Sequence, residues 1–276
     1  MLGTLIFCAT PIGNLGDLSE RAIETLSSAD VIFAEDTRRT AKLLNHIGVS
    51  VPMKSFHTHN ERSRMTELRN HLDSGDRVVL VSDAGMPVVS DPGMSAVDAA
   101  VAVGAVISVI PGPSAVVTAL AVSGFDGDRF VFEGFLPRKG QARAAIVELI
   151  AQEERTVVFF SAPARVAKDL ARLGQEMASD RRVVLARELT KIHEEIWRGT
   201  VGEAIAHWGG IETTRGEFTV VLEGASRVEP SIDAAVDAVK HLIDQGSTTS
   251  DAVRQIAKSA GVSRRELYGI IVKDLS

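Results

Sequence analysis

The sequence predicts an α/β protein with two successive α/β domains and a small helical module at the C-terminal end. Short apolar runs rich in Val, Ile and Ala alternate with amphipathic segments over most of the 276 residues. Turn residues in "GFDGDRF" (124–130) interrupt this alternation, and after residue 226 no apolar strand follows. We therefore divide the chain into domains at 1–123 and 124–226, followed by a helical module at 227–276.

The first domain is expected to contain a mostly parallel, doubly wound sheet, because each predicted strand is followed by a predicted helix. The strands are apolar runs at 4–9, 30–36, 77–83 and 105–111. The helices are amphipathic or Ala-rich segments at 18–29, 37–48, 61–75, 95–104 and 114–124. Ser19 is the predicted N-cap of the first helix, and Gly48 ends the second.

The second domain repeats the alternation, and the tail does not. Its predicted strands lie at 130–135, 155–163, 181–189 and 217–224. Helices are predicted to end near Ile150 and to cover 164–177 and 200–209. In the tail, helices are predicted over 231–246 and 249–275, the second broken by a turn at Gly261 with Ser263 as the next N-cap. That pattern is typical of a helix-turn-helix. The tail nevertheless carries as many acidic as basic residues, so its formal charge is near zero.

Composition excludes several classes of protein. A disulfide framework is impossible because Cys8 is the single cysteine, and its apolar run indicates a buried position. No apolar segment is long enough to span a membrane, and the N-terminus lacks the basic region of a signal peptide, so we expect a cytoplasmic protein. The net charge of −6 means that any nucleic acid must be bound by local basic patches.

Three loops rich in Pro and Gly follow three predicted strands of the first domain. They are "ATPIGN" (9–14), "VSDAGMPVVSDPG" (81–93) and "IPGPSA" (110–115). Parallel strands end at one edge of a sheet, where ligands of this fold class bind. Gly85 and Gly93 permit close backbone approach there. No G-x-G-x-x-G or P-loop motif is present, which argues against a conventionally bound NAD or nucleoside triphosphate.

A series of segments resembles one known family, the ribosomal RNA small-subunit methyltransferase I family of the tetrapyrrole-methylase fold class. In chain order they are "TPIGNLGDLSERA", "ADVIFAEDTRRTAKLL", "FHTHNE", "LVSDAGMPVVSDPG", "PGPSAVVTAL", "FVFEGFLPRKG" and "VVLARELTKIHEE". The resemblance covers roughly residues 4–224 and continues into the tail. It implies two α/β domains with S-adenosylmethionine bound in the cleft between them.

The resemblance also implies which residues contact this methyl donor. They are Pro11, Gly85, Met86, Val89, Ser114, Ala115, Ser161, Phe218 and Thr219. The sequence departs from the family pattern at Met86, where a threonine is expected, and at Ser161 and Ala164, where a glutamate and a histidine are common. Contact through the backbone would tolerate the first change. The second puts the role of Ser161 in doubt.

The implied reaction is methylation of a cytidine 2′-hydroxyl in the decoding centre of 16S rRNA, in the assembled 30S subunit. A hydroxyl is a weak acid, so a proton acceptor would help. Polar residues after the second strand and in "FHTHNE" are candidates: Glu35, Asp36, His57 and His59. Asp36 has the alternative role of capping the following helix. No ligand cluster requires a metal.

Five basic residues are candidates for holding RNA phosphates. They are Arg38, Arg39, Arg138, Lys139 and Lys191. Two other functions stay open at this level. The same fold could methylate a small molecule such as a cobalamin precursor, or the tail could belong to a DNA-binding regulator. A homodimer is expected, because this fold class is commonly dimeric.

Overall fold

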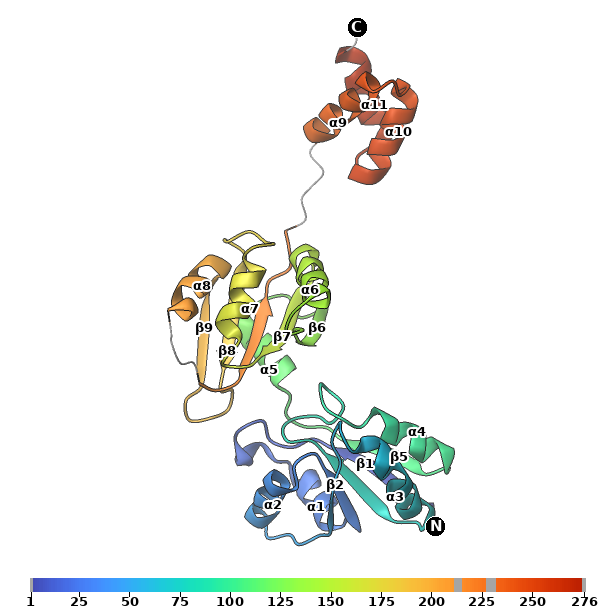
Figure 1. Ribbon diagram of the computed structural model, residues 1–276, viewed down its shortest axis with the longest axis vertical. Helices are drawn as coiled ribbons and strands as arrows, with labels where there is room; N and C mark the ends of the chain where they lie inside the picture. Colours follow the sequence, from blue (N-terminus) through green and yellow to red (C-terminus); the bar gives the residue numbers. More distant parts are fainter. Residues whose placement is uncertain (1, 211–214, 227–231, 275–276) are drawn as a thin grey trace. The chain divides into compact units, whose positions relative to one another are not determined.

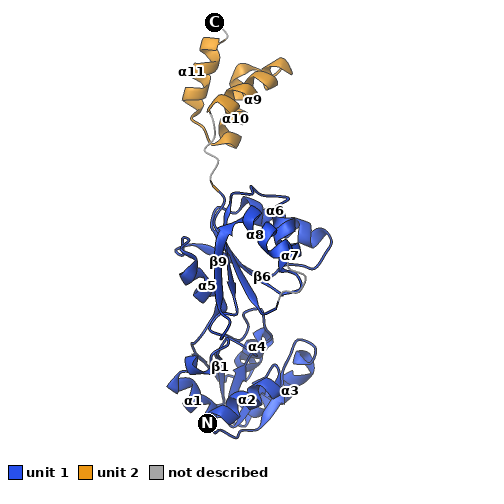
Figure 2. Cartoon of the chain, turned by 90° about the vertical axis from the view of Figure 1, so that its left-hand side faces the viewer, with its two compact units in different colours: residues 1–225 blue, residues 226–276 orange. Residues whose placement is uncertain are grey.

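The computed structural model describes residues 2–210, 215–226 and 232–274. Residues 1–225 form one compact unit and residues 226–276 a second (Figure 2). The first unit contains two five-stranded sheets, and the described part of the second contains helices only. This architecture agrees with the predicted α/β class. The predicted first residue of the helical module, 227, lies outside the described residues.

The first sheet is entirely parallel and has the strand order β3-β2-β4-β1-β5. Its strands are β1 (Thr4–Cys8), β2 (Val31–Ala34), β3 (Met53–Ser55), β4 (Arg77–Val81) and β5 (Val106–Ile110). Strands β1, β2 and β4 are buried almost throughout. Strand β3 was not predicted, because three half-buried residues give too short a pattern to recognise in a sequence.

Helices cover both faces of this sheet, as a doubly wound fold requires (Figure 1). Helices α1 (Glu20–Ser27) and α2 (Thr37–His46) pack on one face, following the short 3₁₀ helix η1 (Leu15–Asp17). Helices α3 (Glu61–Asp73) and α4 (Met94–Ala102) pack on the other. The Ser19 hydroxyl accepts a hydrogen bond from the Ala22 amide, which confirms the predicted N-cap.

The second sheet has the order β6-β7-β10-β8-β9; β6 runs parallel to β7, and the other neighbours are antiparallel. Its strands are β6 (Phe130–Phe135), β7 (Thr156–Ser161), β8 (Arg182–Arg187), β9 (Glu195–Thr200) and β10 (Phe218–Leu222). Strand β9 was not predicted from the sequence. This edge strand has half-exposed residues and polar ends, so it lacks the apolar run of its neighbours.

Helices α6 (Gln141–Gln152), α7 (Val166–Leu173) and α8 (Val201–Gly209) cover one face of the second sheet. The opposite face is covered by α5 (Ala115–Ser123), whose Val116 and Ala119 pack with Val158 and Val184. The sequence division assigned α5 to residues 1–123, yet the helix packs on the second sheet. The boundary between residues 123 and 124 stays a prediction.

The second unit is a three-helix module, α9 (Ile232–Asp244), α10 (Thr249–Ala260) and α11 (Arg264–Asp274). Val239, Val253 and Leu267 are fully buried in its core. Gly261 ends α10 with a left-handed φ of 66°, and the Ser263 hydroxyl accepts a hydrogen bond from the Glu266 amide at 3.4 Å. These contacts confirm the predicted turn and N-cap. Among the described helices of the whole chain, none is both long and apolar enough to span a membrane.

Candidate functional site

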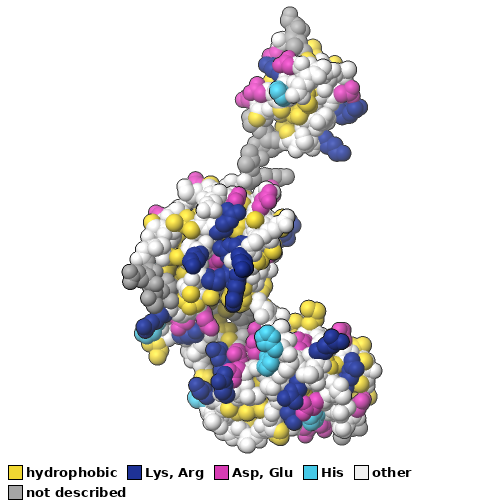
Figure 3. Space-filling model, in the orientation of Figure 1, with side chains coloured by type: hydrophobic (Ala, Val, Ile, Leu, Met, Phe, Trp, Pro, Cys, Tyr) yellow, Lys and Arg dark blue, Asp and Glu magenta, His cyan; other side chains and the backbone are white. Residues whose placement is uncertain are grey.

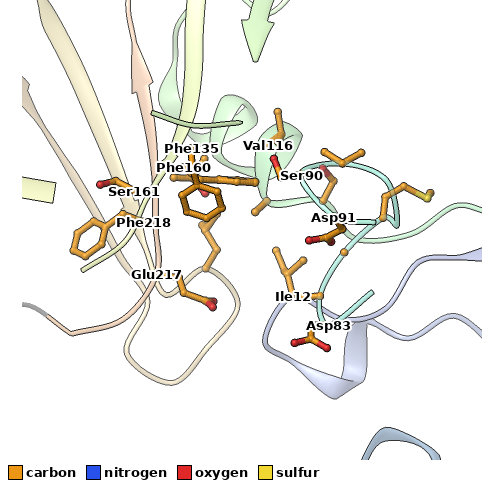
Figure 4. A pocket seen from close by; sticks show the side chains of 18 of the residues that line it. Ile12, Asp83, Ser90, Asp91, Val116, Phe135, Phe160, Ser161, Glu217 and Phe218 are labelled. Carbon is orange, nitrogen blue, oxygen red and sulfur yellow. The ribbon is translucent and has the colours of Figure 1, made fainter. Parts of the chain in front are cut away.

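A cavity of about 420 Å³ lies within the first unit, between the carboxyl-end loops of the first sheet and the end of the second (Figure 4). Its wall combines residues from both α/β domains. All the predicted donor contacts except Pro11 line it, namely Gly85, Met86, Val89, Ser114, Ala115, Ser161, Phe218 and Thr219. Pro11 instead lines a smaller cavity of about 140 Å³ beside it.

Backbone hydrogen bonds hold the loops of the first domain together at this cavity. Thr10 and Gly85 exchange two of them, at 2.9 and 3.0 Å, so the loop after β1 is joined to the loop after β4. The Ala9 amide donates to the Ile110 carbonyl at 3.1 Å, which joins the loop after β5. Gly85 has φ +78°, a conformation that side-chain-bearing residues rarely adopt. The Pro/Gly loops are therefore one connected wall.

Backbone strain is concentrated around the same cavity. Within the described residues, the positive-φ positions other than glycine are Val88, Ser90, Glu188 and Thr190. The first pair is in the loop after β4, and the second pair is in the loop after β8. Such conformations cost about 1–3 kcal/mol each and persist where the surroundings enforce them, commonly at functional sites. The two strained loops lie on opposite sides of the cavity, which they line with residues such as Ser90 and Leu189.

Three carboxylates gather on the first-domain side of the cavity. Glu35, Asp83 and Asp91 line it, and Figure 4 shows Asp83 and Asp91 opposite Phe160 and Glu217. The Asp83 amide donates to Glu35 Oε2 at 3.2 Å. Burial, together with the nearby Glu35 charge, raises the pKa of Asp91 to about 6. Burial likewise raises the pKa of Glu35.

The other catalytic candidates lie outside this wall. Asp36 caps α2: its carboxylate accepts from the Arg38 amide at 2.9 Å and forms an ion pair with the Arg38 guanidinium at 2.7 Å. The Arg38 side chain thereby holds the pKa of Asp36 well below its usual range, which makes it a weak base. His59 lies in the turn that follows β3, with its ring 6.0 Å from that of His57. Neither histidine lines either cavity.

The five basic candidates are divided between the cavity and the surface. Arg39 and Lys191 line the large cavity. Lys191 is paired there with Glu188 at 2.7 Å and Glu217 at 2.8 Å. Arg38 lies on the exposed side of α2, and Arg138 and Lys139 lie on an exposed loop after β6. In the view of Figure 3, Lys and Arg side chains gather on both α/β domains.

A buried ionic network supports the second-domain wall, and it was not predicted from the sequence. The Ser161 hydroxyl donates to Asp169 Oδ2 at 2.7 Å. Arg143 and Arg165 place guanidinium nitrogens 2.8 and 3.3 Å from Asp169 Oδ1. Both arginines also donate to the Pro137 carbonyl, just after the cavity residue Phe135. The sequence signal for Asp169 was an aspartate at an otherwise apolar position of an amphipathic helix.

The arrangement suits a ligand that is cationic and partly apolar. Three carboxylates line the first-domain side, and the other side combines aromatic and aliphatic side chains with the paired Lys191 and Glu217; the loops offer backbone donors and acceptors. Glu217, Phe160 and Ile12 complete the wall and were not singled out from the sequence. Among the described residues, no group of three His, Cys, Asp or Glu side chains could hold a metal ion.

Comparison with known proteins defines the class of the molecule. Residues 4–205 match the family Tetrapyrrole (Corrin/Porphyrin) Methylases. The fold resembles the crystal structure of uroporphyrin-III C-methyl transferase from Thermus thermophilus complexed with S-adenyl homocysteine. The TM-score is 0.56 at 16% identity, over 79% of this chain and 96% of that one. The protein is therefore a methyltransferase with this two-domain fold.

Curated relatives identify the particular family. A protein of Synechocystis sp. is 44% identical over 270 residues, which are 97% of this chain and 96% of the relative. One of Thermotoga maritima is 47% identical over 223 residues, covering 81% of this chain and 99% of the relative. Both are named ribosomal RNA small subunit methyltransferase I. The chain belongs to this family, and the resemblance predicted from its sequence motifs is confirmed.

Proposed function

We propose that this protein transfers the methyl group of S-adenosylmethionine to the 2′-hydroxyl of a cytidine in the decoding centre of 16S rRNA. The acceptor is the assembled 30S subunit, and the reaction takes place in the cytoplasm, where that subunit is found. Membership of the family supports the rRNA substrate. The observation that carries the proposal is the cavity itself, because carboxylates, strained loops and an apolar wall converge there.

The methyl donor would occupy the large cavity. Its sulfonium group supplies an electrophilic methyl carbon. Glu35, Asp83 and Asp91 would stabilise the positive charge of the donor through the low-dielectric interior of the cavity. Gly85, Met86 and Val89 would meet it largely through backbone groups, so Met86 can replace the threonine expected from the family pattern. Phe135 and Phe160, whose ring centroids are 5.4 Å apart, supply apolar contact from the second domain.

The transfer is an in-line displacement, in which the ribose oxygen bonds to the methyl carbon as the carbon–sulfur bond breaks. The electron pair of that bond stays on sulfur. The hydroxyl proton must leave, and we assign its acceptance to the Asp91 carboxylate. A pKa of about 6 makes Asp91 a stronger base than an ordinary aspartate and leaves it ionised at neutral pH. Glu35 raises that basicity by its nearby charge.

Dimerisation is proposed through the edge of the first sheet. Among the described residues no strand pairs with the outer side of β5, and α5 lies over the second sheet rather than over β5. Val106, Ile107 and Val109 of this strand are 51%, 40% and 49% exposed. Ile107 and Val109 lie on one face of this strand and Val106 lies on the other. Exposed β-branched side chains on an edge strand favour association, and a second copy of this chain would cover them.

The dimer is tested by light scattering on chromatographed protein. Val109→Asp is expected to shift the molar mass toward the monomer. The control Leu149→Asp changes a residue that is 64% exposed on α6 and should leave the mass unchanged. An unaltered mass for Val109→Asp would place the interface elsewhere.

The function is tested by methyl transfer from labelled S-adenosylmethionine. The acceptors are 30S subunits lacking the modification, naked 16S rRNA and a tetrapyrrole precursor. We expect one 2′-O-methylcytidine in the subunits, located by its block to alkaline cleavage. Transfer to the tetrapyrrole alone would instead support a small-molecule methyltransferase of the same fold. Deletion of residues 230–276 should leave donor binding intact in a methyltransferase. Loss of donor binding would instead favour a DNA-binding regulator whose function depends on the helical module.

A further inference from the structure

The smaller cavity, of about 140 Å³, has a character different from the large one. It lies between α2 and the loop after β1, and its wall is not dominated by carboxylates. Arg39, Lys42 and Thr40 contribute from the helix. Pro11 and Leu15 contribute from the loop region. The cavity therefore has a cationic rim on the side of the helix, and opposite it a mixed wall of apolar and polar groups that includes one carboxylate, Asp83.

The two cavities are neighbours that share lining residues. Arg39 and Asp83 belong to both walls. Arg39 Nη1 lies 3.5 Å from Asp83 Oδ2, a loose pairing in which the Arg39 side chain is 61% exposed. Lys42 belongs to the smaller cavity only. A ligand in the smaller cavity would thus lie directly beside the methyl donor without touching most of the donor's wall.

The charges on α2 are neutralised to different degrees. Arg38 is bound by the Asp36 carboxylate, which its guanidinium contacts with two nitrogens, at 3.0 and 2.7 Å. Lys42 is exposed, and across the described residues it has no carboxylate within 4.0 Å. Arg39 and Lys42 are three positions apart, so they share one side of the helix. In a molecule of net charge −6, this is a local concentration of positive charge beside the donor cavity.

We propose that the smaller cavity is the acceptor subsite, in which Arg39 and Lys42 bind a backbone phosphate of the RNA strand carrying the target ribose. The proposal rests on the proposed function, because it assumes an RNA acceptor. Cationic side chains bind phosphodiesters with little regard to sequence and hold the strand in register. Pro11 and the 44%-exposed Leu15 offer apolar contact to the adjoining sugar. Arg39, at the boundary, would orient the reacting nucleotide toward the donor.

This placement separates two binding functions that a single cleft would combine. Substitution of Lys42 should weaken the acceptor and leave the donor unaffected. Substitution of Arg39 should weaken both, because Arg39 also holds Asp83 of the donor wall. A structural role for Lys42 is disfavoured, since the residue is exposed.

The test uses the full chain with Lys42→Ala and Lys42→Glu. Arg69→Glu is the matched control, because Arg69 is an exposed cation of α3 on the opposite face of the same sheet. Donor-site binding is measured as the Kd of S-adenosylhomocysteine by calorimetry, and the acceptor as the KM for 30S subunits. We expect Lys42→Ala to raise this KM several-fold and to reduce the slope of log affinity against log salt by about 1. Lys42→Glu should raise it by about tenfold or more.

In both Lys42 variants, and in Arg69→Glu, the Kd of S-adenosylhomocysteine should stay within about twofold of the wild type. An unchanged KM for Lys42→Glu, with active wild-type enzyme, would overturn the acceptor subsite and leave the proposed function intact. A KM that rises equally in Arg69→Glu would also overturn it, because the effect would be general electrostatics. Absence of transfer by the wild type to any RNA would instead contradict the proposed function.

Discussion

Substitution of Asp169 tests whether the buried ionic network supports the donor cavity. The Asp169 side chain is 2% exposed and receives a hydrogen bond from Ser161, and the side chains of Arg143 and Arg165 are 13% and 23% exposed. Asp169→Ala would leave two guanidinium groups and a hydroxyl without their shared acceptor. These groups are fixed in place by β7, by α6 and by the N-terminal end of α7, where Arg165 is the N-cap residue.

The expected loss follows from the burial of the partners. Removing one member of a buried ion pair costs about 3–5 kcal/mol, because the remaining charge is poorly solvated. Arg143 and Arg165 retain some access to water and also contact backbone carbonyls, which favours the lower end, about 3 kcal/mol. For a unit of this size that is a fall in Tm of about 6–12 °C. The donor should also bind more weakly, because Phe135 and Ser161 line its cavity.

The assay is thermal unfolding by calorimetry, together with the Kd of S-adenosylhomocysteine. Asp98→Ala, at an exposed position of α4, is the control and should change stability by less than about 0.5 kcal/mol. The pair Ser161→Glu with Asp169→Ser moves the carboxylate to the facing residue and should recover most of the stability lost in Asp169→Ser. A loss below about 1 kcal/mol for Asp169→Ala, or a double variant no better than Asp169→Ser, would refute the reasoning.

Three further predictions concern the first-domain loops and α2. Because the pKa of Asp91 is raised to about 6, single-turnover transfer should rise as pH increases through about 6. The same raised pKa means that the stability contributed by protonated Asp91 is fully present below about pH 4 and is lost as the pH rises through about 6. Asp91→Asn should therefore be more stable than the wild type by about 1 kcal/mol at pH 7.5, yet transfer the methyl group at least about 100-fold more slowly. A fast Asn variant would exclude Asp91 as the proton acceptor. Gly85→Ala should lower the free energy of unfolding by about 1–2 kcal/mol and weaken S-adenosylhomocysteine binding, because φ at this position is +78° and the new Cβ meets Ile12 at 3.4 Å. An unchanged Tm and an unchanged Kd would contradict the proposal that the conformation of this loop shapes the donor cavity. Asp36→Asn should transfer the methyl group at a rate within a few-fold of the wild type, because asparagine also caps helices. A loss of about 100-fold in the same single-turnover assay would restore Asp36 as a catalytic candidate.

Local patterns predicted most of the secondary structure because they depend on neighbouring residues. Apolar runs such as that of β4 and the capping of α1 by Ser19 are readable within a few positions. The edge strands β3 and β9 were missed because pairing with a neighbouring strand stabilises them, and their own patterns do not. Helix α5 is apolar on nearly every side, so its sequence does not indicate which sheet it covers.

For the candidate site, the sequence alone determined the three Pro/Gly loops, the edge of the sheet where they meet and the family resemblance. Only the tertiary structure distinguished among the polar residues. Asp36 forms an ion pair with Arg38, whereas Asp91 lies near Glu35 in the cavity. The sequence alone does not indicate which of the two aspartates is a helix cap with a low pKa and which is a buried carboxylate with a raised pKa. The link from Asp169 to Ser161, and the cavity beside Lys42, likewise depend on how separate elements pack. The physical reason is that a side chain's chemistry depends on its burial and its charged neighbours, which are set by contacts distant in the chain.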